Sequence, residues 1–127
     1  MHLAAEIGDL NIAKFLATLP NIDFNASAYK ERSVIHAAVR SGNIDVVQFC
    51  ATLPNVDVNA VDSGGRGRRP IHYAALRGYI DIVRFLATLP SVDLNVLDDR
   101  GLTPAEIAAV FGHSDVVIFI KSFQAMV

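Results

Sequence analysis

The chain repeats itself at a nearly constant interval, and this constrains its fold more than any other feature. The segment Phe15–Asn25 returns with few changes as Phe49–Asn59 and again as Phe85–Asn95. A series of glycines separated by 34, 36 and 34 residues has the same spacing: Gly8, Gly42, Gly78 and Gly112. Two independent sets of landmarks with one period predict an array of four repeated units.

Each unit predicts two short helices followed by a return loop. The first helix carries a pair of small residues, which allows a neighbouring helix to approach closely, and then a glycine suited to a helix C-cap. The second helix has an apolar stripe of period 3.6, from which we expect a phenylalanine column in the core: Phe15, Phe49, Phe85 and Phe119. Helices of about eight residues cannot bury an apolar face alone, so the units have to stack. The predicted fold is an all-α solenoid with protruding loops.

The unit resembles the ankyrin repeat. Residues 99–109 read DRGLTPAEIAA, close to the family pattern D-x-x-G-x-T-P-L-H-x-A-A. Residues 70–75 (PIHYAA), residues 57–60 (DVNA) and the Gly112-His113 pair match other parts of that pattern. Some positions depart from it. Glu106 replaces the usual His, Glu31 replaces a turn Gly, and Ser33-Val34 and Arg69-Pro70 replace Thr-Pro.

The resemblance implies one ankyrin-repeat domain over residues 1–127, built as four stacked helix-turn-helix units with projecting hairpin loops. The expected repeats are residues 1–27 (partial), 28–61, 62–97 and 98–127. The chain begins roughly a third of the way into a repeat, and its last repeat lacks the polar outer face that a terminal repeat needs, so we expect the chain to be a fragment of a larger protein. The alternative is that residues 123–127 extend the last helix as a cap. The long return loop is similar to repeats of effectors from intracellular bacteria and of protist proteins.

Composition excludes several classes of protein. Hydrophobic residues make up 52% and charged residues 19%, which excludes intrinsic disorder, and the apolar runs are too short to span a membrane. The first residues lack the features of a signal peptide. A single cysteine excludes an internal disulfide. We therefore expect a cytoplasmic protein, or one in the host cytosol or nucleus if it belongs to a bacterial effector.

The chemistry-bearing residues fall on repeat positions. His2, His36 and His72 recur with the period, which favours a structural histidine that bonds to a neighbouring turn. The histidines lack the spacing of a zinc site, and Cys50 lies in the apolar stripe of its helix. The glycine-rich segment 63–70 lacks the Lys-Ser/Thr of a phosphate-binding loop. We expect no catalytic site, no metal, no cofactor and no small-molecule substrate.

In ankyrin arrays, partners usually dock on the concave side, which is formed by the hairpin tips and the first helices. Eight of the 11 basic residues map to hairpins or first-helix ends, so this side is expected to be a basic groove. Such a groove would steer an acidic segment of a partner protein. The expected binding residues are Arg32, Arg40, Arg66, Arg68, Leu76, Arg77, Arg100, Leu102 and Phe111.

Alternatives remain for these residues and for the function. The hairpin charges are also compatible with a merely solvated surface, and Leu76 and Phe111 with packing between repeats. The leading interpretation is a non-catalytic protein-interaction module, such as a scaffold. The alternative is a substrate-recruiting domain of a multidomain enzyme or bacterial effector whose catalytic domain lies outside this chain. Nucleic-acid binding lacks the interleaved aromatic residues expected of it.

Overall fold

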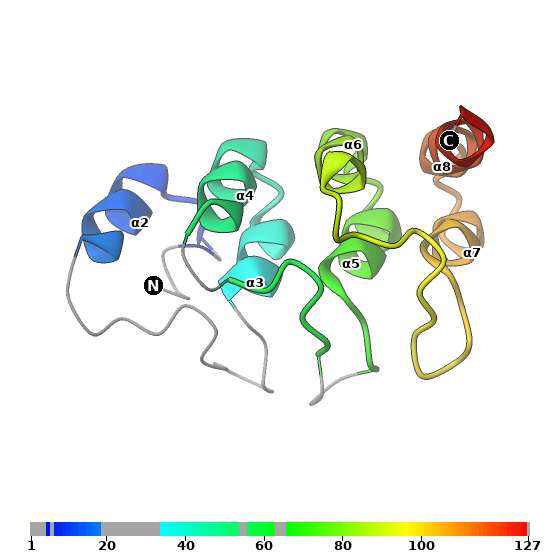
Figure 1. Cartoon of the computed structure of the whole chain (residues 1–127), viewed down its shortest axis with the longest axis horizontal. Helices are drawn as coiled ribbons and strands as arrows, with labels where there is room; N and C mark the ends of the chain where they lie inside the picture. The colour runs from blue at the N-terminus through cyan, green and yellow to red at the C-terminus, as the bar shows by residue number, and fades with distance from the viewer. Residues whose placement is uncertain (1–4, 6, 19–33, 54–55, 63–65, 127) are drawn as a thin grey trace.

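The computed structural model describes residues 5, 7–18, 34–53, 56–62 and 66–126, and these form a row of helix pairs (Figure 1). No β-strand occurs within these ranges. The helices with defined bounds are α2 (Leu10–Ala17), α3 (Val34–Ser41), α4 (Ile44–Ala51), α5 (Pro70–Arg77), α6 (Ile80–Thr88), α7 (Pro104–Val110) and α8 (Ser114–Met126). The predicted all-α solenoid is confirmed.

The helices lie in two layers, with the loops projecting on one side. In Figure 1, α2, α4, α6 and α8 form the upper row, α3, α5 and α7 the lower row, and the long loops extend beyond the lower row. Each helix contacts its own pair-mate and its equivalent in the next unit, so that α3 packs on α5, α5 on α7 and α6 on α8. The hairpin loops and the first helices therefore share one side of the molecule.

The helix boundaries follow from local chemistry. The Thr103 hydroxyl accepts the Glu106 N–H at 3.2 Å, and the Glu106 carboxylate accepts the Thr103 N–H at 3.0 Å, which is a capping box. Pro104 follows at the first helical position, where its missing N–H costs nothing. At the other end of a first helix, Gly78 adopts φ 72°, the left-handed conformation predicted for a C-cap.

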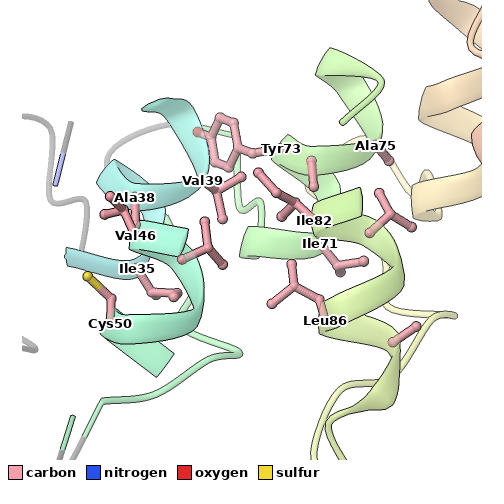
Figure 2. Packing of buried hydrophobic residues seen from close by; sticks show 14 of the residues in the cluster. Ile35, Ala38, Val39, Val46, Cys50, Ile71, Tyr73, Ala75, Ile82 and Leu86 are labelled. Carbon is pink, nitrogen blue, oxygen red and sulfur yellow. The ribbon is translucent and has the colours of Figure 1, made fainter. Parts of the chain in front are cut away.

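The core lies between the two helix layers and is continuous from unit to unit (Figure 2). The second alanine of the pair, Ala38 or Ala75, has no exposed surface, because the next first helix packs directly against it. Cys50 is also fully buried, as predicted. Burial raises the pKa of its thiol to about 11, which keeps it protonated and inert.

The phenylalanine column was predicted as core, and this is only partly right. Phe49 and Phe85 are partly buried residues at the edge of the core, while their neighbours Val47 and Val83 have no exposed surface. In α4 and α6 the valine takes the interior position, and the phenylalanine packs against the core from its edge. Phe119 is also partly buried, and the side chain of Phe15 lies outside the described residues.

The residue after each turn glycine connects its unit to the preceding one. His113 donates from Nε2 to the Leu76 carbonyl at 2.9 Å, and Asn43 donates from Nδ2 to the Gly8 carbonyl at 3.1 Å. The ring of Tyr79 packs over Gly42 in the same way. At Gly42 and Gly78 a Cβ would lie 3.0 Å from the Tyr79 ring and 2.5 Å from the His113 ring, so these two contacts favour glycine in the preceding unit.

The last helix is longer than its counterparts, with 13 residues where α4 has 8. The extra turn carries Phe123, whose ring centroid lies 5.7 Å from that of Phe119, and Gln124, whose Nε2 donates to the Asn95 Oδ1 at 2.8 Å. The additional residues of α8 are thus held on the preceding return loop and on the core.

Candidate protein-binding surface

The projecting loops are hairpins closed by backbone hydrogen bonds. In the third unit, the Asp62 N–H donates to the Arg68 carbonyl at 2.8 Å, and in the fourth, the Asp98 N–H donates to the Leu102 carbonyl at 3.0 Å. The carboxylate of Asp98 also accepts the N–H groups of Arg100 at 2.9 Å and Leu102 at 3.0 Å. Burial alone raises the pKa of Asp98, but these two N–H groups, with His72 and Arg68 nearby, hold it below its ordinary value.

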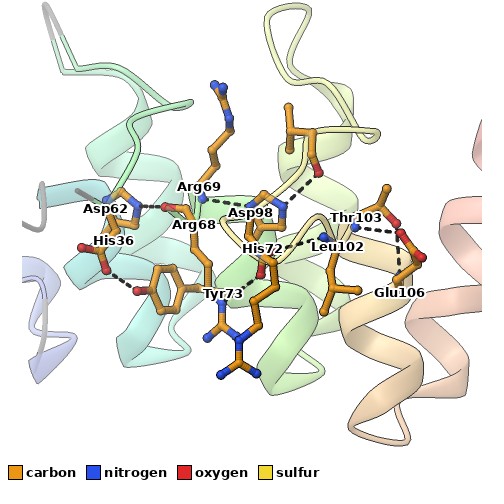
Figure 3. A network of polar contacts seen from close by, with 12 residues as sticks. His36, Asp62, Arg68, Arg69, His72, Tyr73, Asp98, Leu102, Thr103 and Glu106 are labelled. Carbon is orange, nitrogen blue, oxygen red and sulfur yellow. Dashed lines mark hydrogen bonds and ion pairs between the residues drawn. The ribbon is translucent and has the colours of Figure 1, made fainter. Parts of the chain in front are cut away.

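The hairpins are tied to one another and to the first helices. The Asp99 N–H donates to the Arg66 carbonyl of the preceding hairpin at 2.9 Å. His36 donates from Nε2 to the Arg68 carbonyl, and His72 from Nε2 to the Val96 carbonyl, both at 3.0 Å (Figure 3). His36 and His72 are therefore structural, as predicted, and His2 lies outside the described residues. Each one binds a first helix to the following hairpin.

His72 is held as a neutral ring by this arrangement. Its Nδ1 accepts the Arg69 N–H at 2.9 Å while its Nε2 donates, which fixes the tautomer. The ring has no exposed surface. Burial lowers the pKa of His72 below its ordinary value, against the opposing effects of the Val96 carbonyl and the Asp98 carboxylate.

Arg68 was predicted to bind a partner, but its side chain lies inside the hairpin region. It is 12% exposed, its Nε lies 3.6 Å from the Asp98 Oδ2, and its guanidinium stands 5.9 Å from the centre of the Tyr73 ring. The Tyr73 hydroxyl donates in turn to the Asp62 carboxylate (Figure 3). Arg68 thus links two consecutive hairpins, and the structure gives it a stabilising role.

The other predicted residues are more accessible. Arg66, Arg77 and Arg100 are exposed, as is Phe111, with 54% of its surface accessible. The remaining described members of the set are partly buried: Arg40, Leu76 and Leu102. Arg32 lies outside the described residues.

Two apolar residues of this side were missed by the sequence analysis. Val61 and Leu97 are 46% and 59% exposed and occupy the same position in consecutive units, directly before the buried aspartates Asp62 and Asp98. The available signal was an apolar residue that recurs at a polar hairpin.

Basic and apolar residues of the hairpins and of the first-helix ends, exposed or partly buried, form what we call the hairpin-side surface, and the exposed carboxylate of Asp99 lies among them. Leu76 and Arg77 end α5, and Val110 and Phe111 occupy the corresponding positions at the end of α7. Because α5 and α7 pack side by side, these two pairs are neighbours. The hairpin-side surface consists of Val61, Arg66, Leu76, Arg77, Leu97, Arg100, Leu102, Val110 and Phe111.

Comparison with known families agrees with this geometry. Residues 35–125 match the family model described as ankyrin repeats (3 copies). The chain belongs to the ankyrin repeat family. Ankyrin repeats are generally protein–protein interaction modules and are typically non-catalytic. No curated protein matches the sequence.

The described part of this ankyrin array contains no group of three or more His, Cys, Asp or Glu side chains placed to hold a metal ion. Within the same residues, no helix has both the length and the apolar character needed to cross a membrane.

Proposed function

We propose that this ankyrin array binds a partner protein on its concave side, through the hairpin-side surface. The observation that supports the proposal is the exposure of apolar side chains at a hairpin and at the far end of the first helix that follows it. Leu97, Val110 and Phe111 are 59%, 70% and 54% exposed, although neighbouring positions in the same units are fully buried. Clustered apolar side chains that a fold leaves in water are typical of interaction sites.

Arginines flank this apolar group. Arg66, Arg77 and Arg100 are exposed on the hairpins and at the end of α5, while the chain as a whole has a net charge of −2. Such local positive charge would speed association with an acidic segment, but exposed ion pairs contribute little affinity. Affinity would come from burial of the apolar side chains. Arg40, and Arg32 outside the described residues, would extend the surface toward the second unit.

The experiment is capture of partners from a cytosolic extract, followed by binding kinetics with the partner identified. Leu97→Ser with Phe111→Ser should accelerate dissociation. Arg66→Gln with Arg100→Gln should reduce the dependence of the association rate on salt. Ile118→Ser and Lys121→Gln are matched controls, because both residues are exposed on α8, in the other helix layer.

The controls should bind as the unmodified chain does. If affinity survives both hairpin-side changes and falls with a control, the proposed surface is wrong. A captured enzyme substrate, rather than a stable complex, would favour the recruiting-domain alternative on the same surface. A cytoplasmic location, which suits a single buried thiol, remains part of this proposal and is testable by fractionation of the source cells.

A further inference from the structure

Positive charge on the hairpin-side surface is concentrated in the third unit. Residues 61–78, which include the hairpin and first helix of that unit, carry four arginines and one aspartate, a net charge of +3. Two of the arginines, Arg66 and Arg77, are exposed, whereas the aspartate, Asp62, has no exposed surface. The exposed charge that the structure describes in this stretch is therefore entirely positive.

The fourth unit has the opposite charge over the corresponding stretch. Residues 97–112 carry one arginine and three acidic residues, a net charge of −2. The arginine is Arg100, and two of the acidic residues, Asp99 and Glu106, are exposed as it is. The charge of Arg100 is thus offset within its own unit, so the positive potential should fall from the third unit to the fourth.

An apolar side chain replaces a charged one at the first-helix end of the fourth unit. Phe111 occupies the position of Arg77, directly before the turn glycine, and it is exposed, as is Leu97 on the hairpin. Both positions are also exposed one unit earlier, at Arg77 and Val61, where a following unit packs alongside. Their exposure is therefore a property of the repeat position.

The distance between the basic and the apolar positions limits the shape of a ligand. The equivalent helices α5 and α7 pack side by side (Figure 1), and the axes of packed helices lie about 8–10 Å apart. Arg77 and Phe111 hold equivalent positions, so their backbones are separated by about the same distance. The two hairpins are also adjacent, because the Asp99 N–H donates to the Arg66 carbonyl at 2.9 Å. An extended chain covers this distance in about three residues.

An extended ligand suits this surface better than an amphipathic helix. A helix bound in a groove presents a continuous apolar face, with anchors at positions i, i+3, i+4 and i+7. Such a face, laid across both first-helix ends, would cover the Arg77 guanidinium with apolar atoms and leave its donors without acceptors. An extended chain can place a carboxylate near Arg77 and an apolar side chain near Phe111.

We propose that the hairpin-side surface binds an extended acidic segment of a partner protein in a fixed order along the stack. A carboxylate of the segment lies over the third unit, near Arg66 and Arg77, and a bulky apolar side chain about three residues away lies over the fourth, near Leu97 and Phe111. The apolar contact supplies most of the affinity, and the charges determine which unit each group occupies. This inference rests on the proposed function and adds the order of chemical groups along the ligand.

Selection of short random peptides, displayed on phage, against the immobilised chain tests this order. Enriched peptides should share an Asp or Glu about three residues from a Leu, Phe or Trp, in either chain direction. Enrichment without acidic residues, enrichment of apolar residues at helical spacing, or no enrichment would each overturn the inference. The proposed function would survive these results if a captured partner protein still dissociated faster from the variant with Leu97→Ser and Phe111→Ser.

Affinity measurements with the most enriched peptide locate its acidic end. Arg66→Gln with Arg77→Gln should weaken binding by about threefold to tenfold at low salt, and this loss should shrink as salt is added. Arg84→Gln is the matched control, because Arg84 is an exposed arginine of the same unit but lies on α6, in the other helix layer. Equal effects of the double variant and the control would overturn the inference.

A double-mutant cycle locates the apolar end. Replacing the bulky apolar residue of the peptide with alanine should weaken binding to the unmodified chain by about tenfold or more. The same replacement should have little effect on binding to the variant with Leu97→Ser and Phe111→Ser, because the contact is already lost. Equal losses with both chains would show that the apolar end binds elsewhere, and the inference would then be wrong.

Discussion

Replacing Gly78 with alanine measures how strongly successive helix pairs are coupled. Gly78 adopts φ 72°, and an L-residue in this left-handed conformation costs about 1 kcal/mol. A Cβ at this position would lie 2.5 Å from the Nδ1 of His113 and 2.8 Å from its Cγ and Cε1. These distances are too short for any real contact, so the imidazole of the following unit has to move.

Moving that ring breaks the hydrogen bond from His113 Nε2 to the Leu76 carbonyl, now 2.9 Å long. Leaving this part-buried donor and acceptor without partners costs up to about 1–3 kcal/mol, the range for buried groups. With the backbone term, Gly78→Ala should lower the free energy of unfolding by about 2–4 kcal/mol. In a short array this is a large part of the total stability.

Gly112→Ala is the matched control. Gly112 occupies the same position one unit later with φ 79°, but no atom lies within 4 Å of its added Cβ. The control should cost only the backbone term of about 1 kcal/mol, so the difference between the two variants measures the contact between units. The assay is urea unfolding followed by far-ultraviolet circular dichroism, at a concentration where the chain is monomeric. Equal costs for both variants would refute the reasoning, since the His113 contact would then carry no coupling.

Three further outcomes follow from the buried polar groups. Burial lowers the pKa of His72, so near pH 6.5 the unfolded chain binds a proton that the folded chain does not. The free energy of unfolding should therefore fall as the pH drops below about 6.5. The variant His72→Gln should make the urea midpoint less dependent on pH. Arg68→Met should cost about 2 kcal/mol in urea unfolding by leaving Asp98 without its cation, whereas Arg66→Met should leave stability nearly unchanged. A thiol reagent at about pH 8 should label Cys50 in urea but not in the folded chain, and rapid labelling of the folded chain would contradict its burial.

The architecture could be predicted from the sequence because each recurring residue type has the same structural role in every unit. A glycine recurs where the chain needs a positive φ, as at Gly42 and Gly78. A histidine recurs where a ring has to join a helix to the next hairpin, as at His36 and His72. Such residues indicate the local structure around them. When they recur at a fixed interval, they predict that the same unit is repeated and stacked.

The details of the surface could not be predicted in this way, because they depend on what lies in the neighbouring unit. The apolar period of α6 allows either Val83 or Phe85 to point inward, and only the packed position of α8 selects the valine. Similarly, the charge of Arg68 indicates a solvated hairpin until Asp98 of the next hairpin is placed beside it. The recurrence of Val61 and Leu97 indicates an apolar position in the hairpin, but only the packed structure shows that both side chains are exposed.

The same dependence on neighbours separates stability from binding in this array. Arg68 and Leu102 occupy equivalent positions after the hairpin glycine, and Arg68 pairs with Asp98 of the following hairpin. Leu97 and Asp98 are adjacent in sequence, but the leucine is 59% exposed while the aspartate is 6% exposed and organises its hairpin. Substitution of Leu97 should therefore change binding with little effect on folding, whereas substitution of Asp98 would disturb both. Variants chosen from exposure within each unit, rather than from residue type, can thus test the hairpin-side surface without unfolding the array that presents it.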